Sequence, residues 1–155
     1  MTAYKRLLQG LLDAGVSFLV VGGYAAIAHG LTRATDDLDI WIEPTLENAK
    51  RTLQVLQAIG APTAGWTEES IVDPYSFVRV GEETGRKVDL MASAGGDLPF
   101  FQAWPNRFET EFFGLCVPFI GLRDLIHIKR AIGRHKDLAD VESLRNFHKI
   151  PDEEG

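Results

Sequence analysis

The chain has 155 residues, 45% of them hydrophobic and 25% charged, with a formal net charge of −6 at pH 7. This length and composition predict one globular domain with a buried core and exclude a fibrous or largely disordered protein. No apolar run approaches the roughly 18 residues of a membrane span, the N-terminus lacks a signal-peptide layout, and the acidic balance argues against a surface that nucleic acid coats.

Apolar periodicity and glycine positions predict alternating helices and strands in the first part of the chain. A Gly pair, Gly22 and Gly23, directly follows the first apolar strand. The elements expected here, in chain order, are a helix from Tyr4 to Leu12, a buried strand from Ser17 to Val21, a short helix from Tyr24 to His29, a strand from Leu38 to Ile42, and a helix that Thr45 caps and Gly60 ends.

The second part is predicted to complete a sheet and to finish in two helices. Its expected elements are an extended segment from Ile71 to Val80 with an edge position or break at Pro74, a hairpin loop from Gly81 to Gly85, a strand from Arg86 to Met91, a last strand from Phe112 to Ile120, and helices from Leu122 to Ile132 and from Asp137 to Phe147. This order indicates an α/β or α+β fold, with helices packed on one sheet. We expect a single domain over residues 1–155, with a core over about 16–120 and a helical part over about 121–150.

The single cysteine, Cys116, falls in the last predicted strand. One cysteine allows no internal disulfide, so we expect a reducing cytoplasm as the setting. Because the surrounding residues are apolar and aromatic, we interpret Cys116 as a small buried hydrophobe.

Three carboxylates on two predicted strands form the central candidate site. Asp37 and Asp39 alternate with apolar residues, so their side chains share one face of a strand, and Asp89 alternates in the same way. Carboxylates held this close repel each other unless a cation lies between them, and Mg²⁺ prefers such oxygen ligands. Three acids on neighbouring strands are typical of a two-metal site. The alternative is that Asp36 and Asp37 form a solvated turn and Asp39 pairs with a lysine.

The Gly pair before the second helix supplies a candidate phosphate site. Gly22 and Gly23 would let the backbone approach a phosphate closely, at a helix N-terminus that presents free N–H groups. Arg33 and Thr35 either reach the triphosphate or only shape the turn before the acids. His29 is interpreted as a packing or capping residue rather than a base.

Charged residues on the last two helices give a second group of candidates. Lys129 lies beside an apolar helical stripe, so its amine either extends to solvent or faces an anion. Asp137 and Asp140 lie one turn apart at a helix start, where the dipole favours negative charge whatever their function. The remaining cations form either a solvated surface or a local patch for a polyanionic acceptor such as RNA: Arg130, Arg134, His135, Lys136, Arg145, His148 and Lys149.

With these residues the chain resembles the DNA polymerase β-like nucleotidyltransferase superfamily. It is most similar to the branch that contains the AbiEii-type abortive-infection toxins and related toxin–antitoxin nucleotidyltransferases. The resemblance covers about Phe18 to Leu144, and its motifs are residues 20–25, 30–40, 87–90, 125–131 and 136–141. It implies a polymerase β-like core, a mixed β-sheet flanked by helices, with two short C-terminal helices. Gly23 departs from the Gly-Ser of many members, and the helical end is shorter than in many full-length toxins.

The resemblance also implies roles for the candidate residues. Asp37, Asp39 and Asp89 would be the catalytic acids and ligands of one or two Mg²⁺ ions, with Lys129 as a further catalytic residue. The nucleoside triphosphate co-substrate would contact Gly22, Gly23, Arg33, Thr35, Lys129 and Asp140.

We therefore expect transfer of a nucleoside monophosphate to a hydroxyl of RNA, such as tRNA, or of protein, in a toxin–antitoxin or phage-defence setting. The expected partners are the nucleotide, this acceptor and a cognate antitoxin or toxin, and no membrane. Two alternatives remain open. One is a small-molecule acceptor of the aminoglycoside type. The other is a non-catalytic, antitoxin-like binding module, in which the aromatic segment Leu98–Pro105 is either an interaction loop or a cover for the sheet.

Overall fold

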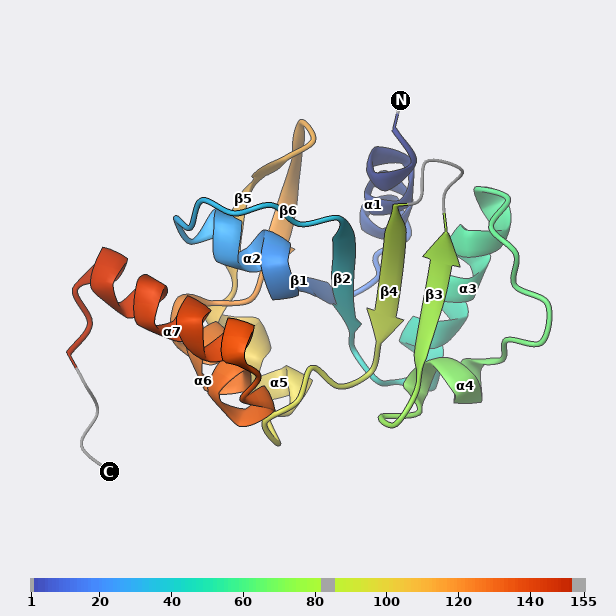
Figure 1. The fold of residues 1–155 in the computed structure, drawn as a ribbon. Coiled ribbons are helices and arrows are strands. Elements are labelled where there is room, and N and C mark those ends of the chain that lie inside the picture. The colour runs from blue at the N-terminus through green and yellow to red at the C-terminus, as the bar shows by residue number, and fades with distance from the viewer. Residues whose placement is uncertain (1, 82–85, 152–155) are drawn as a thin grey trace.

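The computed structural model describes residues 2–81 and 86–151. A six-stranded mixed sheet runs through the molecule in the order β3-β4-β2-β1-β6-β5 (Figure 1). Neighbouring strands pair in parallel for β1 with β6 and for β2 with β4, and the other pairs are antiparallel. The strands are β1 (Phe18–Val21), β2 (Asp37–Ile42), β3 (Phe77–Gly81), β4 (Lys87–Met91), β5 (Phe108–Phe112) and β6 (Leu115–Phe119).

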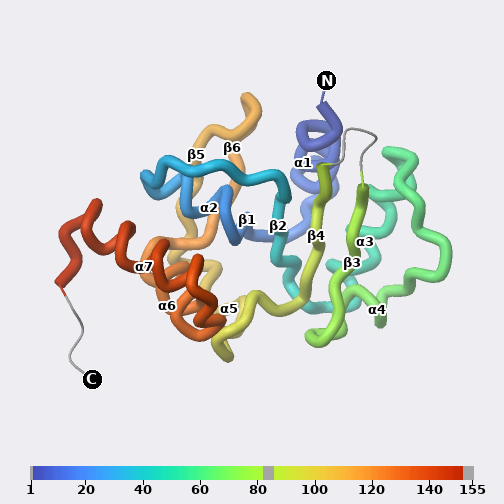
Figure 2. The backbone as a smooth tube through the Cα atoms, in the orientation of Figure 1, coloured from blue at the N-terminus to red at the C-terminus, as the bar shows by residue number. Residues whose placement is uncertain are grey.

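Helices cover the two faces of this sheet. The α1 and α3 helices contact each other behind the sheet in Figures 1 and 2, whereas α2 lies in front and contacts β2 and α6. The helices are α1 (Ala3–Asp13), α2 (Gly22–Ala28), α3 (Leu46–Ala58), α4 (Glu68–Val72), α5 (Phe100–Ala103) with the 3₁₀ turn η1 (Trp104–Asn106), α6 (Leu122–Ile132) and α7 (His135–His148).

Local chemistry explains where several of these elements begin and end. The Thr45 hydroxyl accepts a hydrogen bond from the Asn48 amide and caps α3, as the sequence predicts. Gly133 ends α6 in the left-handed conformation, with φ 70°. The central strand β1 is buried on both faces, and its four residues are apolar. The predicted fold class, a mixed sheet flanked by helices, is therefore confirmed.

Two predicted extended segments are confirmed in part: β3 is an edge strand that follows a break at Pro74, and β6 lies within the predicted 112–120, but the bounds of both segments are wrong. The segment from 71 to 80 begins inside α4, which a Thr67–Ser70 capping box starts, and only its end is strand β3. The predicted strand over 112–120 belongs to a hairpin, in which Phe112 pairs with Leu115 across a two-residue turn. Phe113 and Gly114 have φ of 52° and 78°, which is the geometry of a type I′ turn. Phenylalanine is rare there, so the pattern gave no turn signal.

Cys116 is exposed rather than buried, which corrects the sequence interpretation. It lies opposite Glu111 near the tip of the β5–β6 hairpin, at the edge of the sheet. The predicted hairpin loop of residues 81–85 falls mostly on 82–85, which lie outside the described residues; β3 and β4 on either side pair antiparallel.

None of the helices within residues 2–81 and 86–151 combines the length and the apolarity needed to traverse a bilayer.

Candidate active site

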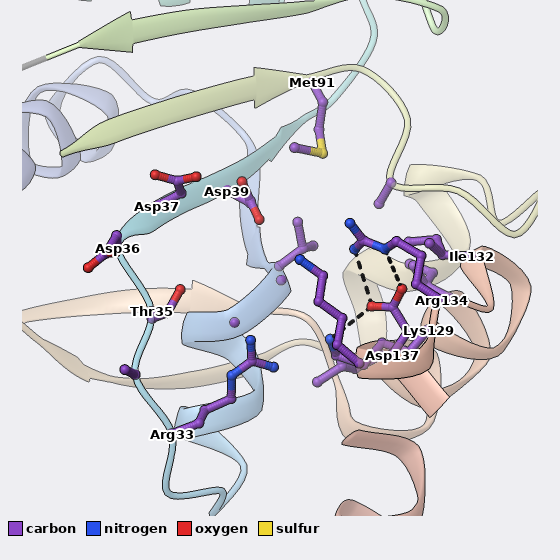
Figure 3. Close-up of a pocket in the computed structure, with 18 residues that line it drawn as sticks. Arg33, Thr35, Asp36, Asp37, Asp39, Met91, Lys129, Ile132, Arg134 and Asp137 are labelled. Atoms are coloured by element: carbon purple, nitrogen blue, oxygen red, sulfur yellow. Dashed lines mark hydrogen bonds and ion pairs between the residues drawn. The ribbon is translucent and has the colours of Figure 1, made fainter. Parts of the chain in front are cut away.

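A pocket of about 450 Å³ lies between β2, the start of α2 and the two C-terminal helices (Figure 3). The structure brings most of the sequence-predicted residues to it, although they come from four separate segments. The predicted residues that line the pocket are Gly22, Gly23, Arg33, Thr35, Asp37, Asp39 and Lys129. The two remaining candidates, Asp89 and Asp140, contact or pair with residues of this set.

The two glycines are required by close approach of other side chains. Gly22 has φ 68°, a left-handed conformation, and a Cβ there would collide with the carboxylate of Asp39. A Cβ on Gly23 would lie 2.6 Å from the Thr35 hydroxyl oxygen. The start of α2 is therefore held directly against β2 and the turn before it, and no side chain larger than hydrogen fits between them.

On the sheet side, the acids form what we call the acid row, Asp37, Asp39 and Asp89. Asp37 and Asp39 are half-buried and alternate with buried residues on β2, and Asp39 pairs in register with Asp89 on the parallel strand β4. Burial, followed by the negative charges of Asp89 and Asp37, raises the pKa of Asp39 to about 6. The row therefore concentrates more negative charge than its surroundings neutralise.

Asp89 differs from the other two acids because a cation of the chain already holds it. The Arg79 guanidinium, on the neighbouring strand β3, donates to both carboxylate oxygens, at 2.7 Å and 3.0 Å. This contact raises the pKa of Arg79. Within the described residues, Asp37 and Asp39 form no hydrogen bond or ion pair through their side chains, so these two carboxylates remain available to a ligand.

The opposite side of the pocket carries cations, and three of them are paired with carboxylates. Lys129, only 5% exposed, places its Nζ 3.0 Å from Asp140 Oδ2 and 3.6 Å from Asp137 Oδ1. Arg134 donates from Nε to Asp137 at 2.6 Å, and Arg33 forms an ion pair with Asp140. We call these five residues the basic wall; Figure 3 shows Lys129, Arg134 and Asp137 of this set side by side.

The buried carboxylate of the basic wall is Asp137, 1% exposed. Burial alone would raise the pKa of Asp137, but the Arg134 hydrogen bond and the charges of Arg134 and Lys129 outweigh it, so the pKa lies below its ordinary value. Asp137 is thus ionised and fixes the two cations that border the pocket. Its structural contacts explain its position without any ligand.

The sequence did not single out Arg79 or Arg134 as individual site residues. Arg134 lies in the predicted basic patch, which the structure divides: Arg134 and Lys136 line the main pocket, whereas Arg130 and Arg145 line a separate cleft of about 110 Å³. Arg79 occupies the position opposite Asp89 in a strand pair. The sequence signal that could have identified Arg79 is its alternation with Val78 and Val80 on the strand that neighbours Asp89.

His29 and the end of α7 anchor the basic wall to the sheet side. His29 is buried at the C-terminal end of α2, and its Nε2 lies 2.7 Å from the Ile120 carbonyl oxygen, so the packing interpretation is confirmed. His148 donates to the His29 carbonyl oxygen, and Phe147 packs against Gly30, where a Cβ would collide with its ring. Burial lowers the pKa of His29.

The donor chemistry of the acid row fits Mg²⁺ at Asp37 and Asp39. Both are carboxylates on one face of a strand, and a divalent cation would relieve the repulsion that raises the pKa of Asp39. Asp89 could join them only by sharing its oxygens with Arg79. In the described part of the chain, no three His, Cys, Asp or Glu side chains are gathered as a ready metal site. The predicted third ligand therefore stays a prediction.

The aromatic segment predicted as a loop or a cover packs mainly on the sheet. Phe100 is 3% exposed and contacts the Trp41 ring edge-to-face, with centroids 5.3 Å apart. Phe101, by contrast, is 72% exposed.

No protein-family model matches the sequence, and no curated protein matches it. Solved structures do resemble the fold. Lincomycin-bound lincosamide antibiotic adenylyltransferase LnuA is 17% identical with a TM-score of 0.59, over 93% of this chain and 97% of that one. A putative nucleotidyltransferase from Thermotoga maritima is 18% identical with a TM-score of 0.57, over 96% and 94%. The antibiotic-resistance factor ANT(2'')-Ia is 14% identical with a TM-score of 0.54, over 94% and 91%. These similarities show that the chain shares the fold of these structures.

Proposed function

We propose that this protein is a nucleotidyltransferase that moves a nucleoside monophosphate from a nucleoside triphosphate to an acceptor hydroxyl. The observation that carries the proposal is the placement of unpaired acids on β2 against the Gly pair of α2, within one pocket that also holds a basic wall. The fold, shared with nucleotidyltransferases of known structure, supports the same chemistry.

The residues divide the work by their contacts. Gly22 and Gly23 line the pocket and carry no side chain of their own, so a phosphate could approach the backbone at the start of α2. Lys129 and Arg134 border the pocket with donors that neutralise the triphosphate. In the reaction, the acceptor oxygen bonds to the α-phosphorus, pyrophosphate leaves with its bridging oxygen, and the hydroxyl proton is released.

Asp37 and Asp39 would hold Mg²⁺, and a bound Mg²⁺ supplies positive charge that polarises the phosphates and favours an ionised acceptor hydroxyl. Asp89 adds negative charge beside Asp39 while Arg79 fixes its orientation. Asp137 and Asp140 hold the cations of the basic wall in position.

The finer assignment is to the AbiEii-type toxin–antitoxin branch. The motif that carries it, residues 125–131 with 136–141, supplies Lys129 of the basic wall and the two carboxylates that pair with it, Asp137 and Asp140. RNA or protein would then be the acceptor. Two of the similar structures contain antibiotics, lincomycin in one and adenylyl-2''-tobramycin in another, which supports a small-molecule acceptor equally well.

The test is label transfer by purified protein. We would incubate it with Mg²⁺, cell extract and each of the four nucleoside triphosphates labelled at the α-phosphorus. We expect label in one acceptor class, no transfer by the double variant D37N/D39N, and full transfer by Asp13→Asn, an exposed control. Transfer that survives in D37N/D39N, or a wild-type protein that labels nothing and binds no nucleotide, would overturn the proposal.

A further inference from the structure

We call the pocket that the acid row and the basic wall border the reaction pocket. A different cleft, of about 390 Å³, lies where β2 and β4 end. We call it the aromatic–acidic cleft. Its apolar lining consists of Trp41, Pro44, Leu98, Pro99, Phe100 and Phe101. This volume falls in the range of small-molecule sites, about 300–1,000 Å³.

The floor of this cleft is rigid. Trp41 is 1% exposed, and its indole Nε1 donates to the Ala92 carbonyl oxygen at 3.1 Å. Phe100 packs on Trp41 at an interplanar angle of 82°, and Phe101 stands exposed at the rim. An apolar ligand would therefore meet a preformed surface and lose little free energy in ordering it.

The cleft is lined by the uncharged polar residues Thr45 and Ser93 and by charged groups of one sign only. Glu43 and Asp97 line it, and no Lys, Arg or His is among the described residues that do. Over residues 2–81 and 86–151, neither carboxylate forms a hydrogen bond or ion pair through its side chain. The exposed Phe101 ring together with these carboxylates favours organic cations, whereas the same carboxylates repel a phosphate backbone.

The cleft continues the face of the sheet that carries the acid row. Trp41 follows Asp39 by two residues on β2, so the two side chains share one face. The Trp41 partner on β4, Met91, lines the reaction pocket, and the next two residues, Ala92 and Ser93, line the cleft. Four residues of extended chain from Asp39 reach Glu43 over about 13 Å, which one small molecule can span.

We infer that the aromatic–acidic cleft binds the protonated amine and apolar body of a small-molecule acceptor, whose hydroxyl reaches the reaction pocket. The inference rests on the proposed function and names the substrate class of the same site. It favours an amino alcohol over RNA as the acceptor, because the charged lining of the cleft is acidic.

The first test measures binding without turnover. In amide NMR spectra, we expect 4-phenylbutylamine to shift signals of residues 43–45 and 97–101 and to bind at least about fivefold more tightly than the neutral 4-phenylbutan-1-ol. The difference should vanish in the double variant E43Q/D97N. It should persist in D13N/E69Q, which removes two exposed carboxylates elsewhere. Equal binding of amine and alcohol, or shifts confined to Asp37–Asp39, would overturn the inference.

The second test uses label transfer to amino alcohols and to their N-acetylated counterparts, which lack the charge. We expect E43Q/D97N to raise KM for an amino alcohol about tenfold, to change kcat less than twofold, and to leave the acetylated acceptor unaffected. Label that enters only RNA, with no competition from amino alcohols, contradicts the inference but leaves nucleotidyl transfer intact. Amine binding with no transfer to any acceptor overturns the proposed function instead.

Discussion

The two sides of the reaction pocket carry opposite charges and treat them differently. On the basic wall, Lys129 and Arg134 are held by Asp137 at 3.6 Å and 2.6 Å, so the chain neutralises these charges itself. On the acid row, Asp37 and Asp39 have no such partner within the described residues. Charge that a fold leaves unneutralised costs free energy in the folded state, and this difference supports our proposal that a cation binds at the acid row.

Single substitutions can test this difference between the acid row and the basic wall. A change on the acid row should harm function and spare stability, whereas a change on the basic wall should harm stability as well. Gly23 and Thr35, which lie where the two sides meet, should show an intermediate effect.

The largest effect is expected for Asp39→Asn. Label transfer should fall by at least about 10³-fold, because the variant would lose a proposed ligand of the Mg²⁺ that polarises the phosphates. Without divalent cations at pH 7, its free energy of unfolding should be no lower than that of the wild type, since the pKa of about 6 shows that ionised Asp39 is unfavourable in the fold. Urea denaturation of both proteins measures this free energy of unfolding. A clear loss of stability would mean that Asp39 has a structural partner after all.

Asp137→Asn, unlike Asp39→Asn, should lower the stability of the fold. The substitution removes a buried carboxylate that bridges Lys129 and Arg134, so we expect the free energy of unfolding to fall by about 3 kcal/mol. Glu142→Gln, an exposed change on the same helix, serves as the control and should stay within about 0.5 kcal/mol of wild type. If both variants unfold at the same urea concentration, the basic wall is not the stabilising side.

The sequence predicted the acid row and the Gly pair because both are local patterns. Alternation along one strand places Asp37 with Asp39, and a strand followed directly by glycines places the start of a helix. The pairing of Asp89 with Arg79 depends on the register of β3 against β4, which no local pattern determines.

Long-range packing also decided the features that the sequence missed. The basic wall joins Arg33 to Asp140, residues separated by most of the chain, and only the tertiary fold brings them together. The β5–β6 turn was missed for a different reason: Phe113 adopts a positive φ that its residue type rarely allows, so the pattern read as one strand.

Gly23→Ala should lower the stability of the fold less than Asp137→Asn does. The added Cβ would lie 2.6 Å from the Thr35 hydroxyl oxygen, and displacing that side chain should cost about 1–2 kcal/mol of unfolding free energy. The double variant G23A/T35A should recover part of this loss, a coupling that a double-mutant cycle measures. Gly81→Ala, where a Cβ meets open space, is the control. Strictly additive losses would show that Thr35 does not set the spacing of the two sides.

The smallest effect concerns pH and the anchor of α7, the helix that carries part of the basic wall. Burial lowers the pKa of His29, so the unfolded chain takes up a proton first as pH falls below 6.5. Stability should then decline with falling pH, by at most about 1.4 kcal/mol per pH unit, and level off below the folded-state pKa. His29→Gln should flatten this dependence, while the exposed His135→Gln should not.

The same titration should separate the two sides of the pocket. Protonated His29 keeps its hydrogen bond to the Ile120 carbonyl, but it is a buried cation beside His148, so it destabilises the end of α2, to which His148 of α7 is bonded. Hydrogen exchange at pH 5 should therefore rise in α7 and stay low in β2, because the acid row is held by the central sheet. Equal increases in α7 and β2 would mean that the basic wall and the acid row open as one unit. The two sides would then differ in charge but not in local stability.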